Sequence, residues 1–539
     1  MTVSSRKLWY LGFCLLLLTL VGSVAAQDAE PQAGGNVSLA LNASFDTLDP
    51  QNWTGFFFST MVMANIYDPL LTRNPTTKEI GPGLAESWDI SDDGLTITLH
   101  LKQGVLFHDG APMTANDVSY AFDRIFDENN APNVRTSLAG AVSSYQVVDD
   151  YTFEITLKAP SAAFLDSLTY PQLSVVCKSA VEQYGADFGQ HPCGTGPFMF
   201  QEWVPDDHLT LVKNPDYNWA PPYFEHTGAA YLDSVTYRFI PEDTTRQGTL
   251  ETGESTMIMY PQNREVPRLL QDPAYTGYPL PRTGMPRVLS LPTDRWPFDD
   301  VLVREAMAYA LDRQQILDVA WDGVGEATSA YLAPGTPCYW DGAEASGIGY
   351  SYDPDMSRSL LEQAGWTLGD DGVLVKDGQR FHVTMSGFQT PLFMTLHQVI
   401  QAQLADVGIE VEIIPLEQAA WLPALRQAEY NFSDNQIGPG SDPNVLYNAL
   451  HSTQVYPNGF NSAFYNNPEV DSLLDAASST MDQAERCDLY QQIQTIVMQD
   501  VPYVPFYAQT DYLVASSALQ GMKFDPKSLP LFYDAYLVS

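Results

Sequence analysis

The sequence predicts an α/β protein built from more than one packed unit. The chain has 539 residues, which is more than one hydrophobic core usually supports, so two or three units are expected. Apolar residues make up 45% of the composition and aromatic residues 12%, enough to bury large cores. Strand-like apolar alternation occurs beside helical patterns, and residues 391–415 read helix, glycine, strand, which is an α/β unit.

The first 26 residues have the layout of a secretory signal peptide. Arg6 and Lys7 precede an apolar run from Leu8 to about Val21, and the small residues 24–26 follow it. An uncleaved membrane anchor is the alternative, because residues 8–26 could nearly span a bilayer. We assign residues 1–26 to a signal peptide and expect a periplasmic or cell-surface location for the mature chain.

The charge balance is strongly acidic. The chain carries 26 Lys and Arg against 66 Asp and Glu, a formal charge of −40, and residues 1–26 hold two of the basic groups. The negative electrostatic field of such a chain excludes nucleic acid as a partner. We expect the chain to contact the membrane only through another protein, because an anionic membrane surface would repel it. We expect the charge to be spread over a solvated surface, with attraction of cationic ligands as the alternative.

The mature chain keeps four cysteines: Cys177, Cys193, Cys338 and Cys487. In an exported protein an even number permits two disulfides, with three possible pairings. Cys177 with Cys193 is the favoured pair because the two flank one short helix-like segment, and Cys338 with Cys487 would be the second. No CxxC or Cys/His cluster supports a metal site.

The most informative stretch runs from residue 86 to residue 126. Residues 95–101 alternate Leu and Ile with Thr and His, which predicts a half-buried strand paired in a hairpin with the strand around Trp88. Thr114 stands three residues before Asp117 and opens a run with helical apolar spacing. This predicts a capped amphipathic helix.

Other elements follow the same rules along the chain. Strands are expected at 36–41, 152–158, 231–240 and 409–413, and helices at 299–313, 353–366, 391–408 and 482–499.

The sequence of residues 86–126, ESWDISDDGLTITLHLKQGVLFHDGAPMTANDVSYAFDRIF, closely resembles the signature of the family 5 extracellular solute-binding proteins. These are the oligopeptide, dipeptide and nickel receptors of ABC importers. Further phrases similar to those of the family appear in the expected order: FDTLDPQNW at 45–53, GTGPF at 194–198, VREAMAYALDR at 303–313 and VPYVPFY at 501–507.

This resemblance implies a two-lobe α/β fold, the periplasmic-binding-protein fold of type II, cluster C-like, with an extra subdomain inserted in lobe I. The implied boundaries are 27–285 for lobe I with the insert at about 81–193, 286–507 for lobe II, and 508–539 for a return to lobe I.

The implied function is capture of a peptide-like solute between the lobes by a monomer that delivers it to an ABC permease and ATPase. No cofactor, metal or enzymatic activity is expected, because the sequence holds no GxSxG, HExxH or phosphate-loop motif. The alternatives are an oligosaccharide receptor of the same fold, a sensory binding protein coupled to a chemoreceptor, and a hydrolase.

The resemblance also gives the candidate ligand-binding residues, from four segments of the chain: Thr47, Asp49, Trp53, Gly194, Thr195, Gly196, Trp421, Gln436, Gly438, Ser441 and Asp442. For the turn at 194–196, a tight strand entry is the alternative. Where the peptide receptors carry an Asp that pairs with the peptide amine, this chain has Pro439, and Gln436 replaces their Trp. We therefore expect a longer or blocked peptide, or an oligosaccharide. Aromatic faces for either could come from Trp53, Phe56, Trp421, Tyr430 and Tyr447, and packing in the core or on the lobe surface is the alternative for each.

Overall fold

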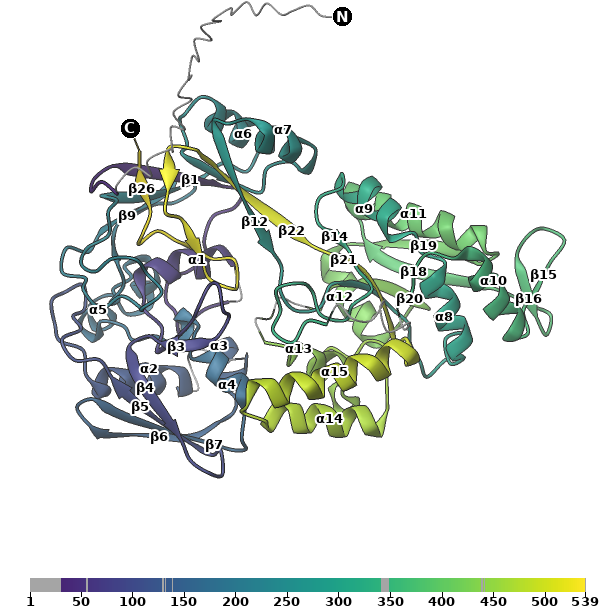
Figure 1. Cartoon of the computed structure of the whole chain (residues 1–539), viewed down its shortest axis with the longest axis horizontal. Coiled ribbons are helices and arrows are strands. Elements are labelled where there is room, and N and C mark those ends of the chain that lie inside the picture. Colours follow the sequence, from purple (N-terminus) through teal and green to yellow (C-terminus); the bar gives the residue numbers. More distant parts are fainter. Residues whose placement is uncertain are drawn as a thin grey trace, which may run out of the picture.

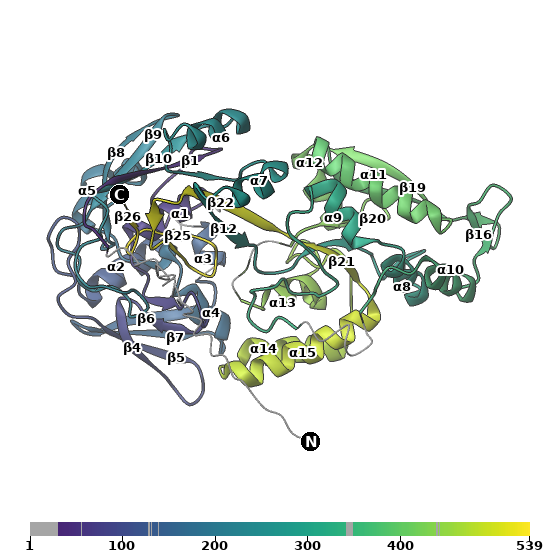
Figure 2. The same cartoon turned by 45° about the horizontal axis from the view of Figure 1, so that its top comes forward.

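A computed structural model describes residues 31–54, 57–127, 130, 132–137, 139–340, 349–437, 440 and 442–538. The predicted signal peptide lies outside this range, as do Phe56, Gly438, Pro439 and Ser441. The chain forms two α/β lobes side by side, joined by two strand connections in the middle of the molecule (Figure 1; Figure 2). In the described part of the chain, no helix combines the length and apolarity that a membrane crossing requires.

Lobe I is built on a seven-stranded sheet whose first strand pairs in parallel with a strand nearly 200 residues later. In sheet order the strands are β12 (Tyr275–Pro281), β22 (Thr510–Ser516), β11 (Met257–Met259), β1 (Asn36–Leu41), β10 (Ser234–Phe239), β9 (His208–Lys213) and β8 (Phe198–Val204). The expected strands at 36–41 and 231–240 are thereby confirmed as β1 and β10. Helices α1 (Phe57–Ile66), α6 (Asp243–Glu251) and α7 (Val266–Gln271) pack against this sheet.

A four-stranded antiparallel sheet with its own core completes lobe I. Its order is β4 (Ala85–Ile90), β5 (Thr96–Leu101), β7 (Thr152–Leu157) and β6 (Val142–Asp149). It is accompanied by α2 (Ala115–Phe126), α3 (Pro132–Ser137), α4 (Ala162–Ser167) and α5 (Lys178–Tyr184). Ile97, Leu99 and Leu101 of β5 are buried, while the residues between them are partly exposed, as the alternation predicts.

Helix α2 begins where the capping pattern predicts. Asp117 Oδ2 accepts a hydrogen bond from the backbone N–H of Thr114 at 2.8 Å, which satisfies a donor that the first helical turn leaves unpaired. The apolar face of the helix, Val118, Ala121, Phe122 and Ile125, is fully buried against the four-stranded sheet.

Lobe II is built on a six-stranded sheet: β14 (Glu326–Ala327), β21 (Tyr503–Ala508), β13 (Arg287–Ser290), β20 (Phe432–Asn435), β18 (His382–Phe388) and β19 (Glu410–Leu416). Its helices are α8 (Val301–Tyr309), α9 (Arg313–Trp321), α10 (Pro354–Gln363), α11 (Pro391–Asp406), α12 (Gln418–Gln427), α13 (Val445–Leu450), α14 (Pro468–Ser479) and α15 (Gln483–Asp500).

The helix, glycine, strand unit of the sequence is α11 followed by β19. Gly408 has φ +86°, a left-handed conformation that ends the helix at little cost, and β19 then pairs in parallel with β18. The helix expected over 299–313 is present as α8 but ends at Tyr309, and α9 begins at Arg313. Asp312 caps the second one, because its Oδ1 accepts the backbone N–H of Gln315 at 3.0 Å.

The remaining strands form short sheets at the edges of the lobes. These are β2 (Leu71–Arg73) with β3 (Ile80–Pro82), β15 (Thr367–Leu368) with β16 (Leu374–Lys376) and β17 (Gln379–Arg380), β23 (Leu519–Gln520) with β26 (Tyr536–Leu537), and β24 (Lys523–Phe524) with β25 (Pro530–Leu531).

Candidate ligand-binding cleft

The chain passes between the two sheets at two places that lie side by side. Residues 282–286 connect β12 to β13, and Gln509 connects β21 to β22. The backbone N–H of Arg282 donates to the carbonyl oxygen of Gln509 at 2.9 Å, so the two connections are tied to each other. Two short connections that are hydrogen-bonded to each other and lie between two rigid sheets can act as a hinge about which the two lobes close.

A cavity of about 330 Å³ opens beside these connections and takes residues from both lobes. This volume lies at the lower end of the range of small-molecule sites, about 300–1,000 Å³. The lining residues are Trp53, Phe57, Thr60, Tyr170, Met259, Tyr260, Leu280, Arg282, Thr283, Gly440, Asp511, Lys527, Ser528 and Leu529. We refer to it as the interlobe cavity.

The walls of the interlobe cavity are mainly apolar and aromatic, with three charged side chains among them. Arg282 Nε donates to Asp511 Oδ2 at 2.9 Å, which pairs the first connection with the strand that follows the second. Lys527 Nζ donates to Thr169 Oγ1 at 2.9 Å and lies 3.9 Å from the centroid of the Tyr170 ring. Lys527 Nζ also lies 3.7 Å from Asp525 Oδ2. Each of the two cations of the cavity therefore has a carboxylate beside it, Asp511 for Arg282 and Asp525 for Lys527.

The protonation states of these groups follow from burial and charge. Burial alone would lower the pKa of the Arg282 guanidinium, but the charge and hydrogen bond of Asp511, together with Tyr260 and Tyr507, outweigh burial and hold that pKa above its ordinary value. Burial, helped by Asp511, raises the pKa of the Tyr260 hydroxyl well above its usual range. At neutral pH the cavity thus offers a charged guanidinium beside a neutral phenol.

Of the residues expected from the sequence in lobe I, Trp53 lines the interlobe cavity. Thr47 and Asp49 lie behind it. Asp49 is buried and forms an ion pair with Arg124 at 2.6 Å, and Thr47 Oγ1 accepts the backbone N–H of Asp49 at 3.1 Å. These two side chains hold the loop that presents Trp53.

The turn of Gly194, Thr195 and Gly196 is not brought to the interlobe cavity. The Cα positions of Gly194 and Gly196 lie so close to the Ile66–Tyr67 backbone and ring that an added Cβ would come within 2.4–2.5 Å of those atoms. Thr195 is fully buried and donates its hydroxyl to Asp68 Oδ2 at 2.9 Å. The glycines here permit close approach of the chain to itself, which is the tight strand entry that leads into β8.

The residues expected in lobe II occupy a second wall. Trp421 is buried and packs against Phe388, with ring centroids 4.1 Å apart and the ring planes tilted by 34°. With Gln436 it lines a smaller pocket of about 70 Å³. Asp442 points away from the interlobe cavity and binds Arg486. Gly438 and Ser441 lie outside the described residues, and Gly440 between them lines the interlobe cavity.

Sequence reasoning missed the charged groups of the cavity, Arg282, Asp511 and Lys527. They come from the first connection, β22 and the C-terminal segment, and no local pattern links them. The only available signal was the expected entry to lobe II near residue 285, which is next to Arg282.

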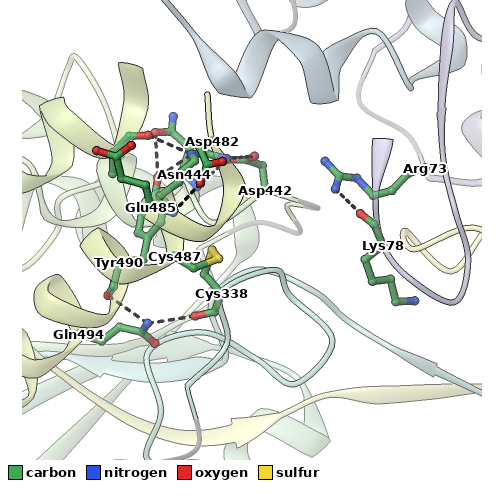
Figure 3. Close-up of a disulfide and its surroundings, with 12 residues drawn as sticks. Arg73, Lys78, Cys338, Asp442, Asn444, Asp482, Glu485, Cys487, Tyr490 and Gln494 are labelled. Atoms are coloured by element: carbon green, nitrogen blue, oxygen red, sulfur yellow. Dashed lines mark hydrogen bonds and ion pairs between the residues drawn. A yellow bond between two sulfur atoms is a disulfide. The ribbon is translucent and has the colours of Figure 1, made fainter. Parts of the chain in front are cut away.

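Both disulfides expected from the sequence are formed. Cys177 and Cys193 are joined with their Cα atoms 5.4 Å apart, and Cys338 and Cys487 with theirs 4.8 Å apart. Figure 3 shows the second disulfide beside Asp442 and Asn444 of lobe II, with Arg73 and Lys78 of lobe I on the facing side. Cys487 lies on α15 and Cys338 on the loop before residue 340, so this disulfide is internal to lobe II.

The model of the bacterial extracellular solute-binding proteins, family 5, matches residues 79–457. The glutathione-binding protein GsiB of Salmonella typhi is 32% identical over 533 residues, which cover 97% of this chain and 98% of that protein. Among solved structures, DppA of Helicobacter pylori in complex with the peptide STSA has a TM-score of 0.73 at 30% identity and covers 94% of this chain and 99% of that one. HbpA2 of Haemophilus parasuis, at 24% identity, shares the fold with a TM-score of 0.82 over 94% of this chain and 100% of that one.

The family model covers well over half of the chain, the relatives align from end to end, and the two lobes enclose a cavity at their connections. The chain belongs to the family 5 extracellular solute-binding proteins, the substrate receptors of ABC importers.

Proposed function

We infer that the chain is an exported, monomeric receptor that captures a peptide-like solute in the interlobe cavity and delivers it to an ABC permease and ATPase. In this proposal lobe I is 27–285 with an inserted subdomain at about 81–193, lobe II is 286–507, and residues 508–539 return to lobe I. The sheet membership of the strands supports this division, because β12 and β22 belong to one sheet and β13 and β21 to the other.

The observation that carries the proposal is the position of the cavity. It lies at the two connections and is lined by side chains of lobe I and of the connections and by the backbone of Gly440 from lobe II. A solute that contacts both lobes favours the population in which they are closed, and closure is a shape change that a permease can recognise. Binding alone performs this task, with no covalent chemistry.

The chemistry of the cavity supports a solute that carries a carboxylate. Arg282 and Lys527 are the cations of its lining. Asp511 accepts a hydrogen bond from Arg282 Nε, and Asp525 lies 3.7 Å from Lys527 Nζ, beyond hydrogen-bond distance, so both cations keep N–H donors for a solute. Arginine and lysine bind carboxylates through charge-assisted hydrogen bonds. Trp53, Tyr170 and Leu280 offer apolar surface for the uncharged parts of the solute. Glutathione, the ligand named for the GsiB relative, has this composition and is the first candidate.

Titration calorimetry of the mature chain tests the proposal with glutathione, amino-blocked and free peptides of two to five residues, and neutral oligosaccharides. We expect micromolar binding of glutathione or of the longer or blocked peptides, and a loss of about tenfold or more in K527Q, because a charged hydrogen bond is removed. K158Q, which removes an exposed lysine bonded to Gly140, is the matched control. Binding confined to oligosaccharides would replace the peptide proposal, and micromolar binding of free dipeptides would contradict the expectation of a longer or blocked peptide.

A further inference from the structure

Lobe II carries a second, smaller pocket beside the interlobe cavity. Its volume is about 70 Å³, and its lining is Trp421, Leu422, Leu425, Arg426, Asn435, Gln436, Ile437, Phe460 and Ser462. We call it the Arg426 pocket. Ile437 lines it and Gly440 lines the interlobe cavity, so at most about 11 Å of chain separates the two linings.

Arg426 has no acidic partner among the described residues. No carboxylate there lies within 4.0 Å of its guanidinium, and its Nε is buried and makes no hydrogen bond with any described residue. Its Cζ lies 4.7 Å from the centroid of the Phe460 ring, so the planar group is held against an aromatic face. Phe460 is 44% exposed, which leaves the pocket accessible.

The two side-chain amides of the Arg426 pocket are each partly used by a neighbour. Gln436 Oε1 accepts a hydrogen bond from Arg287 Nη2 at 3.4 Å, so the amide NH₂ of Gln436 remains as a donor. Asn435 Nδ2 donates to Ser462 Oγ at 3.3 Å, so the Oδ1 of Asn435 remains as an acceptor. The described lining contains no Asp or Glu, and the positive charge of Arg287 is already matched by buried Asp434.

The rest of the lining is apolar, with Trp421, Leu422 and Leu425 on its walls. The space suits an anionic group on a short aliphatic arm. A buried guanidinium nitrogen without a partner carries a free-energy cost that an incoming carboxylate would remove. An uncharged amide would bind there more weakly, because it forms no charge-assisted pair with the guanidinium, and an amine would bring a second positive charge.

We propose that the Arg426 pocket is a second subsite of the cleft, which takes a carboxylate on a short aliphatic arm of the captured solute. The proposal deepens the proposed function, since it requires that the solute lies between the lobes. A solute with two carboxylates would then place one at Arg282 and Lys527 and the other at Arg426. These two contacts would orient the solute, in place of the Asp that pairs with the peptide amine in the peptide receptors and that is replaced here by Pro439.

The first experiment uses small probes and does not depend on the identity of the solute. Succinate and the uncharged succinamide are titrated by calorimetry into the mature wild type, R426Q, R426K and R358Q. R358Q is the matched control, since Arg358 lies in lobe II on α10, exposed and paired with Asp355. We expect saturable succinate binding that weakens about 10- to 100-fold in R426Q, less in R426K, and not in R358Q, while succinamide does not saturate.

The second experiment repeats the comparison with glutathione and its glycine amide. A wild-type preference for the acid that disappears in R426Q supports the subsite. Absence of saturable succinate binding, or equal succinate binding by wild type and R426Q, overturns it. If succinate behaves as expected but neither glutathione nor any peptide binds, the proposed function fails and the subsite stands. Thermal melting of R426Q and R426K shows whether each variant is folded.

Discussion

Arg486 donates two hydrogen bonds of 2.6 Å to the carboxylate of Asp442, one from each terminal nitrogen. Both side chains are largely buried, with 9% and 12% of their surface exposed. Asp442 follows the loop that contributes Gly440 to the interlobe cavity, and Arg486 stands next to Cys487 on α15. The pair therefore fastens a wall of the cleft to the longest helix of lobe II.

We expect D442N to lower the free energy of unfolding by about 3 kcal/mol, because it leaves a largely buried guanidinium without its counter-charge. Urea denaturation followed by circular dichroism measures this. The matched control is D355N, which breaks the exposed Arg358–Asp355 pair and should cost less than about 0.5 kcal/mol. Equal losses in the two variants would show that the Asp442 pair contributes no more than a surface ion pair.

The Cys338–Cys487 disulfide anchors the loop that supports the first connection between the lobes. The N–H of Ala333 donates to the carbonyl of Gly284 at 2.8 Å, and the N–H of Gly284 donates to Thr336 Oγ1 at 2.9 Å. We expect C338S/C487S to raise deuterium uptake over residues 282–290 several-fold, because local opening of a segment becomes easier when its support is released.

Hydrogen exchange with mass spectrometry measures that change, and C177S/C193S is the control because its disulfide lies in lobe I, far along the chain from this connection. The control should raise uptake near residues 177–193 and leave residues 282–290 unchanged. A uniform rise across all peptides of lobe II in C338S/C487S would mean a general loss of stability and would contradict the specific support of the connection.

His108 makes the stability of lobe I depend on pH. Its Nε2 bonds to the carbonyl of Gly196 at 3.0 Å, and its Nδ1 accepts the N–H of Gly194 at 3.3 Å, so the neutral ring joins both ends of the turn. Burial lowers the pKa of His108 to about 4, from an ordinary value of 6.5. Stability from the neutral ring is therefore complete above pH 6.5 and is lost as the pH falls from 6.5 towards 4.

We expect the wild type to lose roughly 3 kcal/mol from this group between pH 7 and pH 4, and H108F to lose less over the same interval, since it has no proton to gain. Unfolding by urea at several pH values gives both slopes. H208F is the control: the hydrogen bond to the adjacent Asp207 raises the pKa of that half-buried histidine, so its removal changes the slope in the opposite sense. Parallel curves for wild type and H108F would refute the role of His108.

The parts of the fold that the sequence predicts are those determined by neighbouring residues. The alternation of β5 and the capping of α2 by Asp117 depend on spacings of two and three residues, and both are present. The helix over 299–313 was predicted too long, because Asp312 caps a new helix and the apolar pattern runs through the break.

The cleft is harder to predict, because Arg282 and Asp511 come together only through the two connections, from residues 229 positions apart. Thr195 illustrates the opposite case. Glycines on both sides suggest an approach to a ligand, but the partner of Thr195 is Asp68 of the same lobe. One sequence does not distinguish a backbone that approaches a ligand from one that approaches its own chain.

The lobes also touch away from their connections, where the turn between α14 and α15 reaches lobe I beside α4 (Figure 1; Figure 2). Met481 in this turn packs against the core of the four-stranded sheet.

We expect M481D to weaken binding of any solute held in the interlobe cavity by about fivefold to tenfold. The loss of buried apolar surface between the lobes disfavours the closed population, although Met481 does not line the cavity that holds the solute. M356D, which changes an exposed methionine on α10, should bind as the wild type does. Calorimetry gives the affinities, and small-angle scattering of the solute-saturated proteins should show a larger radius of gyration for M481D. An unchanged affinity and radius would mean that the connections alone, and not this contact, determine closure.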